Sequence, residues 1–201
     1  MNSKQFLGVE LPVIQAPMAG VQDHALPVAV SRAGGLGSLP CAMLSAQALQ
    51  EQASSFRAET SGPLNTNFFC HTPSDFNLAR EQKWRRELLP YFSEYGIEPE
   101  SIAAGVSRQP FLHEHADILE VIRPEVVSFH FGLPEKSLLQ RVKSLGAVVL
   151  SSATTVKEAQ WLESHGADGI IAQGLEAGGH RGMFLTGDIT SQLGMFSLLP
   201  Q

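Results

Sequence analysis

The chain has 201 residues and a formal net charge of −6, from 14 basic and 20 acidic residues. Hydrophobic residues make up 43% of it and charged residues 17%, as in a folded domain with a sizeable core rather than a disordered chain. The acidic balance argues against a nucleic-acid or membrane-surface partner. Two cysteines do not make a disulfide framework, and the N-terminus lacks the apolar core of a signal peptide, so we expect a cytoplasmic protein.

Short apolar runs alternate with longer amphipathic ones along the chain. Strands are expected at residues 11–15, 35–39, 64–69, 126–129, 147–151 and 169–173. Helices are expected at residues 26–33, 45–59, 110–122 and 134–145, and from Thr155 onward. Ser45 and Thr155 are the expected N-caps, and Glu158 follows Thr155 at capping-box spacing.

Residues 72–109 interrupt this alternation. They are polar, contain three prolines and are too long for a simple connection, so we expect an excursion from the domain with a helix near residues 77–95. The last seven residues, 195–201, have the pattern of the start of another helix.

Alternating strands and helices, with mostly apolar strands, predict a parallel sheet covered by helices. Both a doubly wound sheet and a (β/α) barrel fit this pattern, and both bind ligands beyond the carboxyl ends of the strands. A full barrel needs eight units and about 250 residues. Only five units and a sixth strand fit here, so a barrel would be C-terminally truncated.

The segment Gln173-Gly-Leu-Glu-Ala-Gly-Gly-His-Arg-Gly-Met183 carries the clearest sign of a site. Its four glycines allow a sharp turn and a close approach to a ligand. It also carries one histidine, His180, and histidine is the side chain that most readily exchanges a proton near neutral pH. A glycine-rich loop of this kind after a buried strand predicts a cofactor site.

Six such loops occur in order, each after an expected strand: residues 15–20 (QAPMAG), 34–38 (GGLGS), 65–71 (NTNFFCH), 128–132 (SFHFG), 151–154 (SSAT) and 173–182. Together they resemble the nitronate monooxygenase family over nearly the whole chain. The resemblance implies one partial TIM-type (β/α) barrel domain over residues 1–201, with about six of the eight strands. It also implies flavin mononucleotide (FMN) as cofactor, and a nitronate and O2 as substrates.

The resemblance also implies roles for individual residues. His180 matches the family's active-site histidine. The flavin contacts match seven residues: Ala16, Pro17, Met18, Ala19, Asn67, Gln173 and Gly178. The family holds the flavin phosphate with loops after strands seven and eight, which nothing here matches, so this chain alone is expected to bind FMN weakly. No metal site is expected, because neighbouring positions in His113-Glu114-His115 point apart on a helix and no third ligand is evident.

Several alternatives stay open. His180 either takes the carbon-bound proton of a nitroalkane or, with a nitronate, orients the substrate and stabilises charge. The same scaffold would also suit an FMN-dependent NAD(P)H reductase of the quinone or enoyl-acyl-carrier-protein type, or an inactive fragment that self-associates. Gly34, Gly35 and Gly37 either allow a tight turn or touch a ligand. His71 and His130 either line the pocket mouth or have structural roles.

Overall fold

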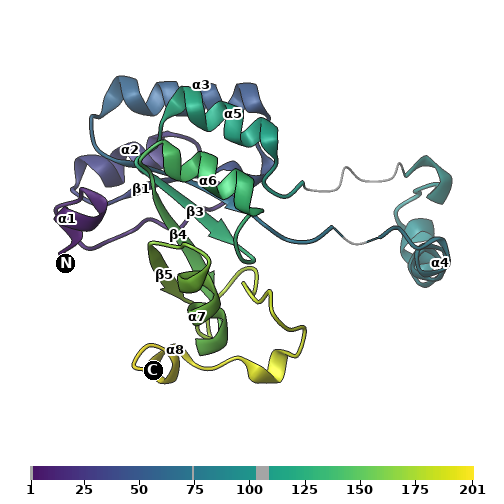
Figure 1. Ribbon diagram of the computed structural model, residues 1–201. Helices are drawn as coiled ribbons and strands as arrows, with labels where there is room; N and C mark the ends of the chain where they lie inside the picture. Colours follow the sequence, from purple (N-terminus) through teal and green to yellow (C-terminus); the bar gives the residue numbers. More distant parts are fainter. Residues whose placement is uncertain (1, 74, 103–108) are drawn as a thin grey trace. The chain divides into compact units, whose positions relative to one another are not determined.

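The computed structural model of the chain describes residues 2–73, 75–102 and 109–201 (Figure 1). The chain divides into two compact units, residues 1–71 with 109–201, and residues 72–108. The elements are α1 Ser3–Leu7, α2 Ala25–Arg32, β1 Gly37–Pro40, η1 Cys41–Met43, α3 Ala46–Glu59, β2 Leu64–Phe69, α4 Leu78–Glu94, η2 Pro99–Ser101, α5 His113–Ile122, β3 Val126–His130, α6 Lys136–Ser144, β4 Val148–Ala153, α7 Val156–Ser164, β5 Gly169–Ala172, η3 Ile189–Ser191 and α8 Met195–Leu198.

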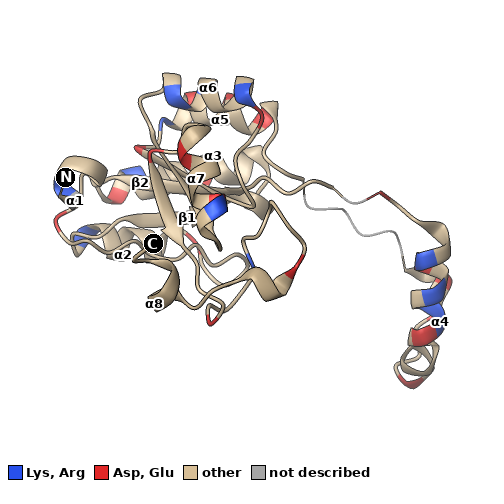
Figure 2. Cartoon of the chain, turned by 60° about the horizontal axis from the view of Figure 1, so that its bottom comes forward, with Lys and Arg blue, Asp and Glu red and all other residues tan. Residues whose placement is uncertain are grey.

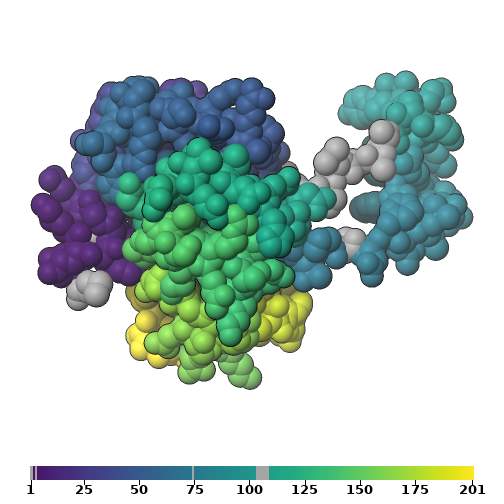
Figure 3. Space-filling model, turned by 45° about the horizontal axis from the view of Figure 1, so that its top comes forward, coloured from purple at the N-terminus to yellow at the C-terminus, as the bar shows by residue number. Residues whose placement is uncertain are grey.

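The first unit is built on a parallel sheet whose strand order, β1-β2-β3-β4-β5, is also the order along the chain. A doubly wound sheet reverses its strand order at a switch point, whereas a (β/α) barrel adds each strand beside the last. The sequential order therefore selects the barrel, and the expected incomplete barrel is confirmed. The helices α3, α5 and α6 lie side by side over one face of the sheet (Figures 1 and 3).

The prediction of a strand at residues 11–15 is wrong. The described part of the sheet has five strands, and this segment joins it only through an isolated parallel bridge between Ile14 and Leu36. The backbone N–H of Gln15 donates to the Leu36 carbonyl at 2.9 Å, and that of Leu36 donates to the Val13 carbonyl at 2.9 Å. The two backbone bonds that would extend this ladder do not form, because the Val13 N–H donates to the Leu11 carbonyl at 2.8 Å and the Ser38 N–H donates to the Gln15 side chain at 3.1 Å.

The helix-facing side of the sheet holds the main core. Alternate residues of β2 and β3, among them Phe68, Val127 and Phe129, pack against buried side chains of α3 and α5. Helix α3 begins as expected, because the Ser45 side chain accepts from the Ala48 N–H at 3.2 Å. At the helix surface Arg141 of α6 pairs with Asp117 and Glu120 of α5. In Figure 2, basic residues (blue) lie on α6 and acidic residues (red) on α5.

The other face of the sheet changes character along its strands. At the amino ends it is apolar, and Val126 and Leu150 pack in a second cluster with Phe6 and Leu7 of α1. Toward the carboxyl ends the polar side chains of Asn67, Ser128, His130 and Ser152 line this face, while Asn65 lies deeper, at the level of Val126. Helix α1 therefore covers one end of this inner face, and the polar end remains for a site.

Gly37 explains how closely α2 packs on β1. A Cβ atom at Gly37 would lie 2.4 Å from the backbone oxygen of Pro27, so no side chain fits there. Gly35 is similarly close to Val30 and to the Val13 carbonyl, at 3.0 and 3.1 Å. Of the two interpretations left open for these glycines, the contacts of Gly35 and Gly37 favour the tight turn from helix to strand over a ligand contact.

The second unit contains α4 and η2. Asn77 caps α4 by accepting from the Arg80 N–H at 2.9 Å, and the helix ends at Glu94, close to the limits expected from the sequence. Arg85 pairs with Glu81 one turn earlier. Within the described ranges, none of the helices combines the length and apolar character needed to cross a bilayer.

Candidate active site

A cavity of about 410 Å³ lies at the carboxyl ends of β2 to β5, on the inner face of the sheet. The residues that line it are Ile14, Gln15, Ala16, Pro17, Asn65, Asn67, Phe69, Ser128, His130, Ser152, Ile171, Gln173, Gly178, Gly179 and His180. Ligands bind at this end of the strands in parallel α/β folds.

All the site residues expected from the sequence line this cavity except Met18 and Ala19. Their roles toward a cofactor stay predictions. Sequence reasoning missed Gln15, Asn65, Ser128 and Ser152, among others. Alternation along β2 would have found Asn65, because residues 65, 67 and 69 must share a face.

The loop 16–22 is held by two glutamines. Gln15 brackets Ser38 of β1, because its Oε1 accepts from the Ser38 N–H at 3.1 Å and its Nε2 donates to the Ser38 carbonyl at 3.2 Å. Gln22 donates to the same carbonyl at 2.9 Å and accepts from the Met18 N–H at 2.8 Å. Met18 therefore uses its backbone N–H to close its own loop.

Two asparagines of β2 form the floor of the cavity. Asn67 donates from Nδ2 to the Ser128 hydroxyl at 2.9 Å, and Asn65 donates from Nδ2 to the Ser38 hydroxyl at 2.9 Å. The Oδ1 atom of Asn65 is buried and has no hydrogen-bond partner among the described residues. A buried acceptor left unpaired costs free energy. An N–H group of a ligand would satisfy it.

Gln173 shapes the loop that carries His180. Its Oε1 accepts from the Gly182 N–H at 2.6 Å, and its Nε2 donates to the His180 carbonyl at 2.9 Å. The amide was expected to face a flavin, and the structure adds that it bonds the backbone on both sides of Arg181. Arg181 itself donates to Gln192, and Glu176 accepts from the Met195 N–H at 2.9 Å. The two charged residues on either side of His180 therefore tie the loop to the chain that follows it.

His130 ends β3 and faces the same loop. Its Nε2 lies 3.2 Å from the His180 carbonyl oxygen, which can only accept, so the hydrogen is assigned to Nε2. Burial lowers the pKa of His130, and its Coulombic interaction with His180 acts in the same direction, against a smaller opposite effect of the hydrogen bond to that carbonyl. In the neutral ring Nδ1 then accepts from the Ser152 hydroxyl at 2.8 Å. His130 thus lines the cavity and also supports the loop.

An aromatic group surrounds the His180 ring. The Phe69 ring lies 5.4 Å from it and the Phe131 ring 6.0 Å, both edge to face. Phe131 has a left-handed backbone, with φ of 69°, which is rare for a bulky residue. This conformation places its ring 4.5 Å from that of His130.

The thiols are not poised as nucleophiles. Burial raises the pKa of both Cys41 and Cys70 far above the ordinary value, so neither forms a thiolate readily. Cys70 is half-buried and packs against the main core. His115 has a local role, since its Nδ1 accepts from the Leu112 N–H at 2.9 Å.

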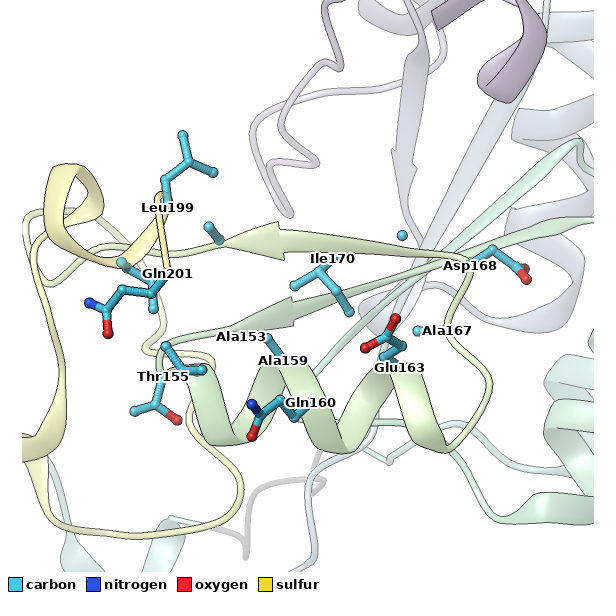
Figure 4. A pocket seen from close by; sticks show the side chains of 14 residues that line it. Ala153, Thr155, Ala159, Gln160, Glu163, Ala167, Asp168, Ile170, Leu199 and Gln201 are labelled. Atoms are coloured by element: carbon cyan, nitrogen blue, oxygen red, sulfur yellow. The ribbon is translucent and has the colours of Figure 1, made fainter. Parts of the chain in front are cut away.

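A second cavity, of about 630 Å³, lies between α7, β5 and α8 (Figure 4). Much of its lining is alanine and aliphatic, including Ala153, Ala159 and Ile170. Of its two acidic residues, Glu163 and Asp168, the latter already pairs with Lys143 at 2.9 Å and accepts from the Val149 N–H at 2.9 Å. The inner cavity, with its converging amides, hydroxyls and imidazoles, is therefore the better candidate site.

Known proteins resemble this chain over nearly its full length. The family model described as "Nitronate monooxygenase" matches residues 2–201. A nitronate monooxygenase of Paraburkholderia phytofirmans is 42% identical over 194 residues, which are 96% of this chain and 53% of that protein. One from Pseudomonas aeruginosa is 42% identical over 184 residues, covering 90% of this chain and 52% of that protein.

A solved structure of nitroalkane oxidase from Streptomyces ansochromogenes superposes with a TM-score of 0.85 at 33% identity. The superposition covers 98% of this chain and 55% of that one. The chain thus spans about half the length of the curated relatives it matches.

Proposed function

Because this chain belongs to the nitronate monooxygenase family, we propose that its inner cavity binds FMN and that the protein oxidises alkyl nitronates with O2. The observation that carries the proposal is the meeting of residues from distant loops on one cavity. Ala16 follows the segment bridged to β1, Asn67 lies in β2, and Gln173, Gly178 and His180 follow β5, yet all five line the same space. Members of the family depend on flavin in general, and FMN is the specific form we propose.

The residues present fit a flavin ring. The Oδ1 atom of Asn65 is a buried acceptor with no hydrogen-bond donor among the described residues. The polar edge of a flavin carries both donors and acceptors and could supply that donor. Beside Gly178 a Cβ atom would meet nothing within 4 Å, so a flat ring has space there. Ala16 and Pro17 add small apolar surface without a long side chain in the way.

The flavin, when bound, supplies the electron transfer between nitronate and oxygen. The chain's own residues bind and orient. Gln173 and His130 fix the backbone of His180, so its imidazole stands at the cavity beside Phe69. From there the His180 ring donates a hydrogen bond to the nitro oxygens of a nitronate, which carry negative charge. With a neutral nitroalkane, the same ring would take the carbon-bound proton.

The proposal includes two further points. The two free thiols suit a reducing compartment, so we place the protein in the cytoplasm. Strand β5 ends the described strand order, so its outer edge has no strand beside it there, and we propose that this edge supports self-association. Sedimentation velocity over a range of concentrations tests this, and a monomer throughout that range would contradict it.

The test of the function is oxygen uptake by FMN-loaded protein with propionate 3-nitronate or another alkyl nitronate. We expect uptake that falls about 100-fold or more in His180→Ala, the usual scale for loss of a positioned acid-base group. His113→Ala is the matched control, because His113 is exposed on α5 and does not line the cavity.

Two outcomes would count against the proposal. A folded chain that takes up no FMN in a fluorescence titration contradicts the cofactor assignment. FMN-loaded protein that leaves nitronates untouched, while NAD(P)H bleaches its flavin rapidly without oxygen, points to a reductase on the same scaffold.

A further inference from the structure

Glu158 is a fully buried carboxylate that the proposed chemistry does not use. It lies in the first turn of α7, three residues after the N-cap Thr155. The sequence pattern predicted a capping box there, and only half of it forms. The Thr155 hydroxyl accepts from the Glu158 N–H at 3.2 Å, while the Glu158 carboxylate accepts from Thr154, one residue before the N-cap, and from Phe184 instead of from the Thr155 N–H.

The carboxylate of Glu158 accepts four hydrogen bonds, two at each oxygen. Oε2 accepts from the backbone N–H and the hydroxyl of Thr154, at 2.7 and 2.8 Å. Oε1 accepts from the backbone N–H groups of Phe184 and Leu185, at 2.8 and 3.3 Å. All four partners can donate, as a group that only accepts requires. Burial removes water as an alternative partner, so these contacts determine where the carboxylate sits.

These bonds join two parts of the site. Thr154 directly follows β4, whose Ser152 lines the cavity, and Phe184 and Leu185 end the loop that carries His180. The Phe184 ring packs 5.2 Å from Trp161 of α7, and its nearest atom would lie 3.1 Å from a Cβ atom at Gly132. Glu158 thus attaches the loop at Phe184 and Leu185, in addition to the bonds that Gln173 and His130 make at His180 and Gly182.

We propose that Glu158 is a positioning residue, whose carboxylate fixes the outgoing end of the loop and so sets where the His180 ring stands beside Phe69 and Phe131. The importance of that position for turnover rests on the proposed function. The placement itself does not, because it concerns only contacts within the chain.

The variant Glu158→Gln tests this with little change of shape. An amide has one accepting oxygen instead of two, so it cannot serve both Thr154 and the loop. Thr155→Ala is the matched control. It weakens the start of the same helix by removing the N-cap bond, and it leaves the bonds to Phe184 and Leu185 in place.

The readout is the NMR signal of the His180 ring in the flavin-free chain, assigned by its loss in His180→Asn. The rings of Phe69 and Phe131 lie close enough for their ring currents to make this signal sensitive to position. We expect Glu158→Gln to shift it and to speed amide exchange at Phe184 and Leu185. Each protein is measured at a temperature the same number of degrees below its own Tm. Under these conditions the His180 signal of Thr155→Ala should keep the chemical shift of the wild type.

An unmoved His180 signal in Glu158→Gln, or an equal shift in both variants, would overturn the proposal. If Glu158→Gln does not fold, Glu158→Asp takes its place, because a side chain one methylene shorter cannot reach both sets of donors. A folded Glu158→Asp with an unshifted His180 signal overturns the proposal as well. Since no flavin or nitronate is present, failure here is distinguishable from failure of the proposed function.

Discussion

The Nε2 atom of His130 lies 3.2 Å from the carbonyl oxygen of His180, so two histidines fifty residues apart meet through a side chain and a backbone. Burial lowers the pKa of His130, which means that the folded chain resists protonating it. Below about pH 6.5, the ordinary value for histidine, the unfolded chain takes up a proton that the folded chain refuses. Folding should therefore lose stability as the pH falls from there toward the lowered pKa.

His130→Gln should remove this acid sensitivity and keep an N–H donor near the His180 carbonyl. Above about pH 7 both forms of His130 are neutral, so the stability difference between wild type and variant should be constant. Urea unfolding at several pH values between 5 and 8 measures it. The pKa of His115 is also lowered by burial, and the difference between the two proteins removes that contribution. Parallel stability curves down to pH 5 would show that His130 does not titrate as described.

Gln173 should show a graded effect on the His180 loop. Gln173→Leu removes both hydrogen bonds to the loop and should cost about 1 kcal/mol of stability, together with a clear loss of FMN affinity. Gln173→Glu keeps the acceptor for Gly182 but loses the donor to His180, so it should fall between wild type and Gln173→Leu in stability. Urea unfolding and FMN fluorescence titration measure the two quantities. Equal stability and equal FMN affinity in all three proteins would show that the hydrogen bonds of Gln173 to His180 and Gly182 do not stabilise the loop.

Alanine should destabilise the chain at one glycine of this loop and leave its stability nearly unchanged at another. At Gly182 a Cβ atom would lie 2.8 Å from the His130 ring and 3.2 Å from Gln173 Oε1, so Gly182→Ala should destabilise the chain by about 1–3 kcal/mol.

At Gly178 a Cβ atom would meet nothing within 4 Å, and Gly178→Ala should change stability by less than about 0.5 kcal/mol. If Gly178 touches the flavin, this substitution should nevertheless weaken FMN binding. Thermal unfolding and FMN titration separate the two effects. A destabilised Gly178→Ala, or a neutral Gly182→Ala, would contradict these contacts.

Gln15 should matter for folding because it satisfies both backbone groups of Ser38. Gln15→Leu leaves the buried Ser38 N–H without this acceptor and should cost about 1–3 kcal/mol. Gln47→Leu is the control, since Gln47 is exposed on α3 and its bond is to Glu51 on the same helix. That substitution should stay within about 0.5 kcal/mol. Similar unfolding midpoints for the two variants would show that the hydrogen bonds of Gln15 to Ser38 do not stabilise the fold.

Local patterns in the sequence predicted much of the fold. Ser45, Asn77 and Thr155 each stand at a helix start, and β2 covers the expected residues 64–69. These features depend on neighbours within a few residues. The strand expected at residues 11–15 is wrong because the two N–H groups that would extend its pairing, those of Val13 and Ser38, donate to Leu11 and to the Gln15 side chain instead.

Features that depend on distant residues were harder to predict. The cavity brings together loops from four strand ends, and the resemblance of those loops to a known family is what made their meeting predictable. The Glu158 carboxylate was assigned to its own helix, because nothing local indicates that Phe184, 26 residues later, supplies the donor. His130 was left between two roles, and its contacts with Ser152 and His180 show that it both lines the cavity and supports the loop.

The contact between Gly37 and Pro27 has a consequence for anyone who diversifies this chain. With only 2.4 Å between the position of a Cβ atom and a backbone oxygen, relief requires α2 itself to move away from β1. A saturation library at position 37, selected for folded protein, should therefore return glycine almost alone, whether or not the selection asks for ligand binding. The absence of other residues at position 37 would then reflect the close spacing of α2 and β1. It should not be interpreted as evidence that Gly37 belongs to the catalytic surface.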